Sequence, residues 1–373
     1  MNNPFRPSFG LSPLVLAGRD DLVRGFQLAF AEGIGAPLRV SLLSGPRGTG
    51  KTVMLNEIED IARSQGWLVL RASPRPGMID NLVDPTIKDA LESLDSQPAP
   101  PSRRVTGARV AGVSLSTEIV EKQESRKTLT TELRKLAEAV RTHGAGVLIT
   151  LDEVQSAKLE ELADLATAIQ DLIRDEYDIA LAAAGLPEGI NALLQHEGTT
   201  FLRRAEHIEL GAVSDDDVAR TFSDTITSAG REVTDDAVAD ATRIIRGYPY
   251  LIQVVGSLSW AAATLDSNNV IGLQHVKSIE SDVEQRMGSH VHQPALRPLS
   301  ESQMDFLYAM ARVAEDGTAQ ISDIADELDT TTTALSMRRR ALLDAGVIVS
   351  PRRGELAFTL PFLREYLLRT DAS

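Results

Sequence analysis

The sequence predicts an α/β fold, in which a parallel sheet with helices on both faces is followed by a small helical lid and a C-terminal winged helix-turn-helix. Three observations predict this fold class. Short apolar runs alternate with helical patterns up to residue 210, which is typical of a parallel sheet. From residue 214 the patterns are helical, and the last segment joins three helical patterns to a hairpin pattern. We expect domains at 1–212, 213–290 and 296–373.

The composition excludes several classes of protein. The chain of 373 residues has no cysteine, so it has no disulfides, catalytic thiols or thiolate metal ligands. Residues 1–16 lack the features of a signal peptide, and no run approaches the ~20 apolar residues of a membrane span. We therefore expect a cytoplasmic protein with no membrane partner. The net charge of −15 argues against a protein that coats nucleic acid with its whole surface, although a local basic patch is compatible with it.

A glycine-rich octet follows the first expected strand, 39–43, and opens a helical pattern. It consists of Gly45, Pro46, Arg47, Gly48, Thr49, Gly50, Lys51 and Thr52. Strand, glycine loop and helix form a P-loop, in which backbone N–H groups and the helix N-terminus face a phosphate. Lys51 would reach the outer phosphates, and the Thr52 hydroxyl would bind Mg²⁺. The octet predicts binding of a nucleoside triphosphate.

Two carboxylates follow an apolar run that is typical of a buried parallel strand. After the second expected strand, 67–72, the run 147–151 ends at Asp152 and Glu153. Ligands of open α/β sheets bind at the carboxyl ends of the strands. We expect Asp152 to hold Mg²⁺ and Glu153 to polarise the attacking water of a hydrolase. The alternative is a solvated acidic turn.

These two motifs together resemble the P-loop ATPases of the AAA+ and STAND types, especially the group related to archaeal ATPases and origin-recognition initiators. The resemblance covers nearly the whole chain and implies ATP as the nucleotide, with Mg²⁺. Residues 16–22 are similar to a family box beside the adenine, which implies contacts from Gly18 and Arg19. Residues 246–252 are similar to the Gly-x-Pro motif of the lid, which implies contacts from Gly247 and Pro249.

The last core strand, expected at 207–210, follows a segment that resembles the family's arginine-finger region. This resemblance implies that Arg203 or Arg204 assists hydrolysis on the nucleotide of a neighbouring subunit, and hence a homo-oligomer. The alternative is a pair of solvated cations at a helix end.

The fourth expected strand, 179–184, has the position of the family's sensor 1 strand. It ends in Ala184 and Gly185, where many relatives carry a polar side chain. The resemblance therefore implies slow hydrolysis, unless another group positions the water. Arg243 and Arg246 are candidates for the family's sensor 2 arginine, although neither has an assignable position.

An insert of about residues 74–130 separates the second and third strands. Prolines at 98–101 end a helical pattern, and 103–120 alternates as in a β-hairpin. Its arginines could contact DNA or a partner, and the alternative is a strand pair packed against the core. After residue 213, helices are expected from caps at Ser214 and Thr234, and over 249–265 and 273–286. We expect a linker at 288–294, whose two histidines are solvated and bind no metal.

The C-terminal pattern resembles DNA-binding winged helices. Its helices are expected from residue 300, over 321–328 and over 332–345, and its hairpin has a tip at 351–354. The third helix would enter a major groove, and arginines at its end and in the wing would contact phosphate. The expected DNA contacts are Thr333, Ser336, Arg339, Arg340, Arg352 and Arg353, with Thr331 and Met337 on the same helix face. Winged helices also bind proteins, and from residue 297 this segment has nine basic and twelve acidic residues.

Three functions fit these patterns. The first is an ATPase that couples ATP binding and hydrolysis to binding of double-stranded DNA. The second is a STAND-like switch that acts on a protein partner and hydrolyses ATP slowly. The arginine clusters favour the first, and the apolar sensor strand and acidic charge favour the second. The third hypothesis is a small-molecule kinase, but this function would not explain the lid and the winged helix.

Overall fold

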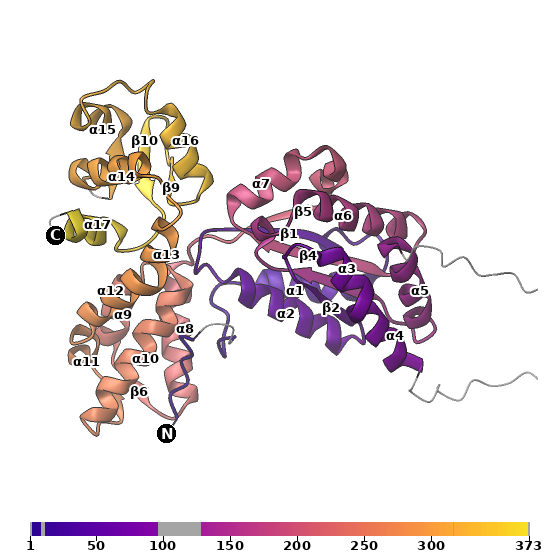
Figure 1. Cartoon of the computed structure of the whole chain (residues 1–373). Helices are drawn as coiled ribbons and strands as arrows, with labels where there is room; N and C mark the ends of the chain where they lie inside the picture. Colours follow the sequence, from indigo (N-terminus) through magenta and orange to yellow (C-terminus); the bar gives the residue numbers. More distant parts are fainter. Residues whose placement is uncertain (1, 9–11, 96–127, 316, 372–373) are drawn as a thin grey trace, which may run out of the picture.

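The computed structural model describes residues 2–8, 12–95, 128–315 and 317–371. Figure 1 shows a core built on one sheet, and beside it the helical lid and the winged helix stacked on each other. The core sheet has the strand order β2-β3-β4-β1-β5, and all its neighbouring strands are parallel. This arrangement confirms the predicted α/β fold class. The strands are β1 (Val40–Ser44), β2 (Leu68–Ala72), β3 (Val147–Leu151), β4 (Ile179–Gly185) and β5 (Glu206–Glu209).

Helices cover both faces of this sheet, as the apolar runs predicted. Successive residues of β3 point to opposite faces: Ile149 packs into the cluster that contains α5 and α6, and Leu148 into the cluster that contains α1 and α2. A strand buried on both sides needs mainly apolar residues, which β3 has, and the hydroxyl of its one polar residue, Thr150, donates to Glu59 at 2.8 Å. The helices of the core are α1 (Asp20–Glu32), α2 (Lys51–Ser64), α3 (Met78–Asn81), α4 (Lys88–Asp95), α5 (Leu129–Arg141), α6 (Leu159–Arg174) and α7 (Pro187–Gln195).

Short helices complete the core around the insert and the sheet ends. Residues Leu82–Ile87 (η2) join α3 to α4, and α4 packs against α5. The hairpin expected at 103–120, with its arginines, lies outside the described residues. The 3₁₀ segments are η1 (Pro37–Arg39), η3 (Val154–Ser156) and η4 (Glu197–Arg204).

The lid is a group of helices joined by a two-stranded sheet. The caps at Ser214 and Thr234 stand where helices α8 and α9 begin, and the Ser214 hydroxyl accepts from Asp217 N at 3.1 Å. Its elements are α8 (Asp215–Ser228), β6 (Glu232–Val233), α9 (Asp235–Ile245), α10 (Pro249–Leu265), β7 (Val270–Ile271), α11 (Leu273–Lys277) and α12 (Glu280–Met287). The apolar side chains of the lid and the winged helix form one continuous cluster.

The linker expected at 288–294 is wrong, because this segment is helical. A π-helical turn, η5 (Gly288–His292), continues α12 into α13 (Gln293–Leu296). Nor is His292 solvated: it is fully buried, its Nε2 lies 2.8 Å from the Pro361 carbonyl, and its ring packs against Tyr366. The segment therefore connects the lid to the winged helix through packed side chains.

Burial of His292 predicts a pH dependence of stability. Burial lowers the pKa of His292 from 6.5 to about 4, although its bond to Pro361 opposes the shift. As the pH drops, His292 is protonated in the unfolded chain at a higher pH than in the folded protein. The free energy of unfolding should therefore fall between pH 6.5 and pH 4, by at most about 3 kcal/mol. Urea unfolding of wild type and His292→Phe across this window would measure it. Whatever its stability at pH 7, the variant should lose the part of this pH dependence that comes from His292. An unchanged dependence of the free energy of unfolding on pH would contradict the role of His292.

The C-terminal segment is a winged helix, as predicted, with some corrections. Its third helix begins at Ser336, not at 332, and residues 332–335 form turns, so Thr333 precedes the helix. A third strand, β8, which was not predicted, pairs with β10 in the order β8-β10-β9. The elements are α14 (Glu301–Val313), β8 (Thr318–Gln320), α15 (Ile321–Glu327), α16 (Ser336–Asp344), β9 (Ile348–Val349), β10 (Glu355–Phe358) and α17 (Leu363–Asp371).

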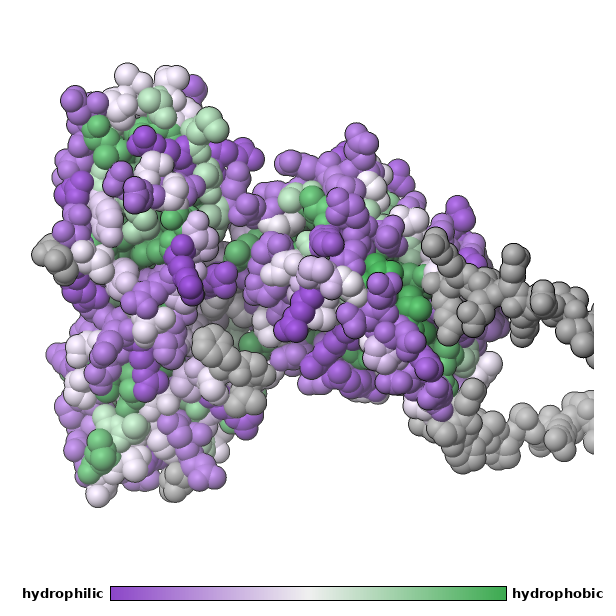
Figure 2. All heavy atoms as spheres, in the orientation of Figure 1, coloured by the Kyte–Doolittle hydropathy of each residue, from purple (hydrophilic) through white to green (hydrophobic). Residues whose placement is uncertain are grey.

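The face of the molecule in Figure 2 is mainly hydrophilic over the core and over the stacked lid and winged helix. Among the helices of the described residues, none combines the length and the apolar character needed to cross a membrane.

Candidate nucleotide-binding site

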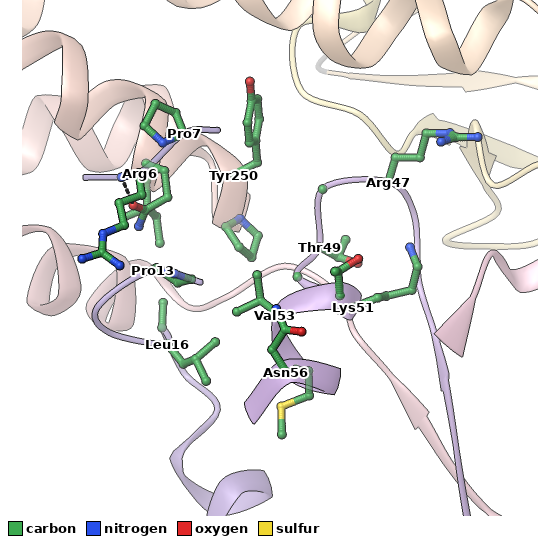
Figure 3. A pocket seen from close by; sticks show the side chains of 18 of the residues that line it. Arg6, Pro7, Pro13, Leu16, Arg47, Thr49, Lys51, Val53, Asn56 and Tyr250 are labelled. Carbon is green, nitrogen blue, oxygen red and sulfur yellow. Dashed lines mark hydrogen bonds between the residues drawn. The ribbon is translucent and has the colours of Figure 1, made fainter. Parts of the chain in front are cut away.

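A cavity of about 390 Å³ lies where the P-loop meets the start of α10 and the N-terminal segment (Figure 3). Parallel strands place the loop after β1 and the carboxylates after β3 at the same edge of the sheet. Of the residues expected to contact nucleotide or water, these line the cavity: Arg19, Arg47, Gly48, Thr49, Gly50, Lys51, Thr52, Glu153 and Pro249. Gly18, Gly45, Pro46, Asp152 and Gly247 lie beside it and do not line it.

The P-loop lysine is held by the loop's own carbonyls. Lys51 is buried, and its Nζ donates to the carbonyls of Gly45 and Pro46, each at 2.8 Å. Burial lowers the pKa of Lys51, and the charges of Glu153 and Asp152 partly oppose this shift. The ammonium therefore lies in a desolvated position beside two carboxylates, where attraction to phosphate is strong.

Thr52 and Asp152 come together as the metal prediction requires. The Thr52 hydroxyl donates to Asp152 Oδ2 at 2.5 Å, and Asp152 Oδ1 accepts from Glu153 N at 2.9 Å. A hydroxyl and a carboxylate oxygen are ligands that suit Mg²⁺, which also takes ligands from substrate phosphates and water. Across the described residues, this site included, no three His, Asp or Glu side chains gather as metal ligands.

Glu153 lines the cavity from a constrained backbone position. Its φ of 55° is left-handed, which is uncommon for a residue other than glycine and is frequent at functional sites. Its carboxylate accepts a hydrogen bond from Gln155 Nε2. The side chain is only partly buried, so a water in the cavity can reach it.

The lid is bonded directly to the main chain of the P-loop. The Tyr248 hydroxyl donates to the Arg47 carbonyl, and Tyr250 N donates to the Gly48 carbonyl at 3.3 Å. Burial raises the pKa of Tyr248 far above its usual value, so the hydroxyl remains a neutral donor. Gly48 has φ +77°, and a Cβ there would lie 2.2 Å from the Tyr248 hydroxyl oxygen, so this approach requires glycine.

The apolar side of the cavity includes an N-terminal segment that sequence reasoning missed. Arg6 N donates to Gln253 Oε1 at 2.9 Å, and the Phe5 ring packs against Gly256 of α10. Figure 3 shows Leu16, Pro13 and Val53 on this side of the cavity, and Lys51 and Thr49 towards the loop. The segment has no periodic pattern that could have indicated it.

Arg19 and Gly18, the two residues expected beside the adenine, have different positions in the structure. Arg19 lines the cavity, and its guanidinium donates to the Gly211 carbonyl at 2.7 Å. Burial lowers the pKa of Arg19, against the charge of Asp217. Gly18 has φ +60°, and a Cβ there would lie 2.4 Å from Val213 Cγ1, so Gly18 allows close packing against the lid.

Comparison with known proteins agrees with this geometry. The model of the AAA ATPase domain family matches residues 15–180. These residues form an AAA ATPase domain. A second family model, a domain of unknown function (DUF8462), matches residues 289–367. No curated protein matches the chain at the level of sequence.

Solved structures share the fold of the AAA ATPase domain together with the segments that follow it. The Walker-type ATPase of Pyrococcus abyssi has 15% identity and a TM-score of 0.65, over 95% of this chain and 96% of that one. The ORC2 protein of Aeropyrum pernix, in ADPNP–ADP complexes, has 14% identity and a TM-score of 0.62, over 98% of both. Cdc6p from Pyrobaculum aerophilum has 17% identity and a TM-score of 0.50, over 97% and 96%. The shared fold is related to that of origin-recognition proteins.

The two candidate arginine fingers, Arg203 and Arg204, lie at the end of the core sheet opposite the P-loop. They end η4, which leads into the start of β5, and the P-loop lies at the opposite ends of these parallel strands. Arg203 Nε donates to the Leu194 carbonyl at 2.9 Å, and Arg204 lines a separate cavity of about 300 Å³. Neither reaches the nucleotide cavity of its own subunit.

The sensor 2 candidates are engaged elsewhere. Arg243 pairs with Asp240 and Glu280, and these bonds raise its pKa. Arg246 stacks on Phe362 at 4.1 Å and lies 3.5 Å from Glu365. Both arginines therefore stabilise the lid and its junction with the winged helix, and neither lines the nucleotide cavity.

The expected DNA contacts are largely accessible. Thr333, Ser336, Arg340, Arg352 and Arg353 are exposed, and Arg339 is half-buried. Met337, on the first turn of α16, is 85% exposed. Arg340 pairs with Asp344 at 2.9 Å, which reduces its positive field. The start of α16 and the wing tip with its two arginines are therefore both open to solvent.

Proposed function

We propose that this chain binds ATP with Mg²⁺, hydrolyses it slowly, and couples the nucleotide state to binding of double-stranded DNA through the winged helix. The observation that carries the first part is the convergence of Lys51, the Thr52–Asp152 pair and Glu153 at one cavity. A charge to hold phosphates, a metal ligand pair and a base are the parts that phosphoryl transfer requires.

Each residue has a distinct role in this proposal. Backbone N–H groups of the P-loop and the start of α2 bind the phosphates, and Lys51 moves from the loop carbonyls to the outer phosphates. Thr52 and Asp152 hold Mg²⁺, which when bound neutralises charge on the phosphate oxygens. Glu153 takes a proton from the attacking water. Hydrolysis is slow because Ala184 and Gly185, at the end of β4, offer no polar side chain to the water.

Two contacts support coupling between the nucleotide and the winged helix. Tyr248 ties the lid to the P-loop at Arg47, so a nucleotide that moves this loop also moves α10. A Cβ at Gly346, after α16, would lie 3.6 Å from the ring of Pro187 in α7. Figure 1 shows α7 as the part of the core next to the winged helix. Because the lid and the winged helix share one apolar cluster, they would move together.

ATP turnover measured during a titration with duplex DNA tests the proposal. We expect DNA to raise turnover, and the effect to weaken between about 50 mM and about 200 mM salt, because phosphate contacts release counterions. Arg339→Ala should cost about 1–3 kcal/mol in DNA affinity, and Arg353→Ala should lower the salt slope by about one. Arg297→Ala, an exposed arginine before α14, is the charge-matched control.

The second candidate is a nucleotide-gated switch that acts on a protein partner. The Arg340–Asp344 pair and the net charge of −15 favour it. Slow turnover that DNA does not change, with no DNA binding in either nucleotide state, would overturn the DNA-coupled ATPase and favour the switch.

An oligomer would give Arg203 and Arg204 their expected role. Because both lie at the edge opposite the P-loop, a finger from this position acts only on the nucleotide of a second copy. We propose a homo-oligomer in which this edge faces the nucleotide cavity of the next subunit.

A further inference from the structure

Gln155 bridges the carboxylate of Glu153 and the main chain that follows β4. Its Nε2 donates to Glu153, and its Oε1 accepts from Leu186 N at 3.0 Å. The orientation of the amide follows from the chemistry, because a backbone N–H can only donate. The oxygen of Gln155 must therefore face Leu186, and its NH₂ group must face Glu153.

Two glycines make room for this side chain. A Cβ at Gly185 would lie 2.9 Å from Gln155 Oε1, and a Cβ at Gly189 would lie 2.7 Å from Gln155 Cβ. The residue thus sits in a close-fitting space between η3, β4 and α7. Its amide cannot turn away from Glu153 without losing the bond to Leu186.

A donor at this place has a chemical consequence. A hydrogen bond to one oxygen of Glu153 fixes the rotamer of the carboxylate and leaves the other oxygen for a water. Ala184 and Gly185, at the end of β4, have no side-chain hydrogen-bond donor. The donor at this place is Gln155, which lies in the turn after β3.

We infer that Gln155 is a positioning residue for hydrolysis, which holds Glu153 against the end of β4 in the orientation that accepts a proton from water. This inference rests on the proposed function of Glu153.

Turnover and ATP affinity of the full chain test it. Gln155→Leu removes both hydrogen bonds at similar volume, and we expect kcat to fall about 100-fold with little change in KM for ATP. Gln155→Glu keeps an acceptor for Leu186 but opposes Glu153 with a second negative charge. This variant cannot donate to Glu153, so its kcat should fall as well, while the KM for ATP stays close to that of wild type. Gln195→Leu, at the exposed end of α7, is the matched control.

The outcomes separate this inference from the proposed function. If Glu153→Gln loses turnover while both Gln155 variants keep the wild-type kcat, the inference is wrong and the proposed function stands. A fall in kcat with an equal loss of ATP affinity would show a structural role only, and would also overturn it. If Glu153→Gln keeps full turnover, or wild type has none, both fail.

Discussion

Replacing Glu153 by glutamine is expected to lower ATP turnover by roughly 10²- to 10⁴-fold, the usual contribution of a general base. ATP affinity should change little, because in the proposed mechanism Lys51 and the loop amides hold the phosphates, Thr52 holds Mg²⁺ and Glu153 contacts only the water. The amide has the size of the carboxylate but cannot take up the proton. Steady-state turnover, together with titration of ATP binding, measures the two effects separately.

The control for this substitution is Glu188→Gln. Glu188 is an exposed carboxylate in the first turn of α7, on the same edge of the core. Glu188→Gln makes the same change in charge without touching the cavity, so turnover should remain that of wild type. Unchanged turnover in Glu153→Gln would remove Glu153 from its proposed role.

Alanine at Gly48 is expected to weaken ATP binding strongly, because the P-loop and the lid approach each other at this glycine. The new Cβ would lie 2.2 Å from the Tyr248 hydroxyl oxygen and 2.6 Å from the ring carbon that bears it. Either the loop or α10 must shift, and the bond from Tyr248 to the Arg47 carbonyl is lost. Loss of a hydrogen bond costs about 0.5–1.5 kcal/mol, to which the clash adds. Titration of ATP binding and thermal unfolding would measure the loss.

Gly50 provides a matched control in the same loop. Its φ of +92° is also left-handed, but a Cβ there meets nothing within 4 Å. In thermal unfolding without nucleotide, Gly50→Ala should therefore show only the backbone strain, of order 1–3 kcal/mol. Equal losses in the two variants would mean that strain alone matters and that the contact with the lid contributes nothing. Gly48→Ala combined with Tyr248→Leu, which relieves the clash, should recover part of the ATP affinity.

Local patterns predicted the parts of the site that are contiguous in sequence. The strand at 147–151 and the helix at 249–265 were placed at the bounds that the structure has. A mainly apolar run is typical of a buried parallel strand, and a proline is typical of the first turn of a helix. Both can be recognised from neighbouring residues alone. The third helix of the winged helix begins later than expected because the preceding threonines, 330–333, favour turns over helix.

Partners distant in sequence could not be predicted in the same way. Nothing near Tyr248 indicates that its hydroxyl reaches Arg47, about 200 residues earlier in the chain. The composition of 288–294 is typical of a linker, yet the segment is helical and His292 is buried at the Pro361 carbonyl. Likewise, only the fold brings Phe5 and Arg6 onto α10, where Arg6 lines the nucleotide cavity.

The sequence by itself determined the P-loop, the two carboxylates and the α/β order of strands and helices, because each depends on short-range geometry: a tight glycine turn, a helix start, the end of a strand. Only the tertiary structure decided that the lid is tied to the P-loop, that the candidate fingers lie away from their own nucleotide cavity, and that Gln155 holds Glu153. These contacts depend on which surfaces meet when the sheet, the lid and the winged helix pack, and burial and directional hydrogen bonds between distant segments determine that packing.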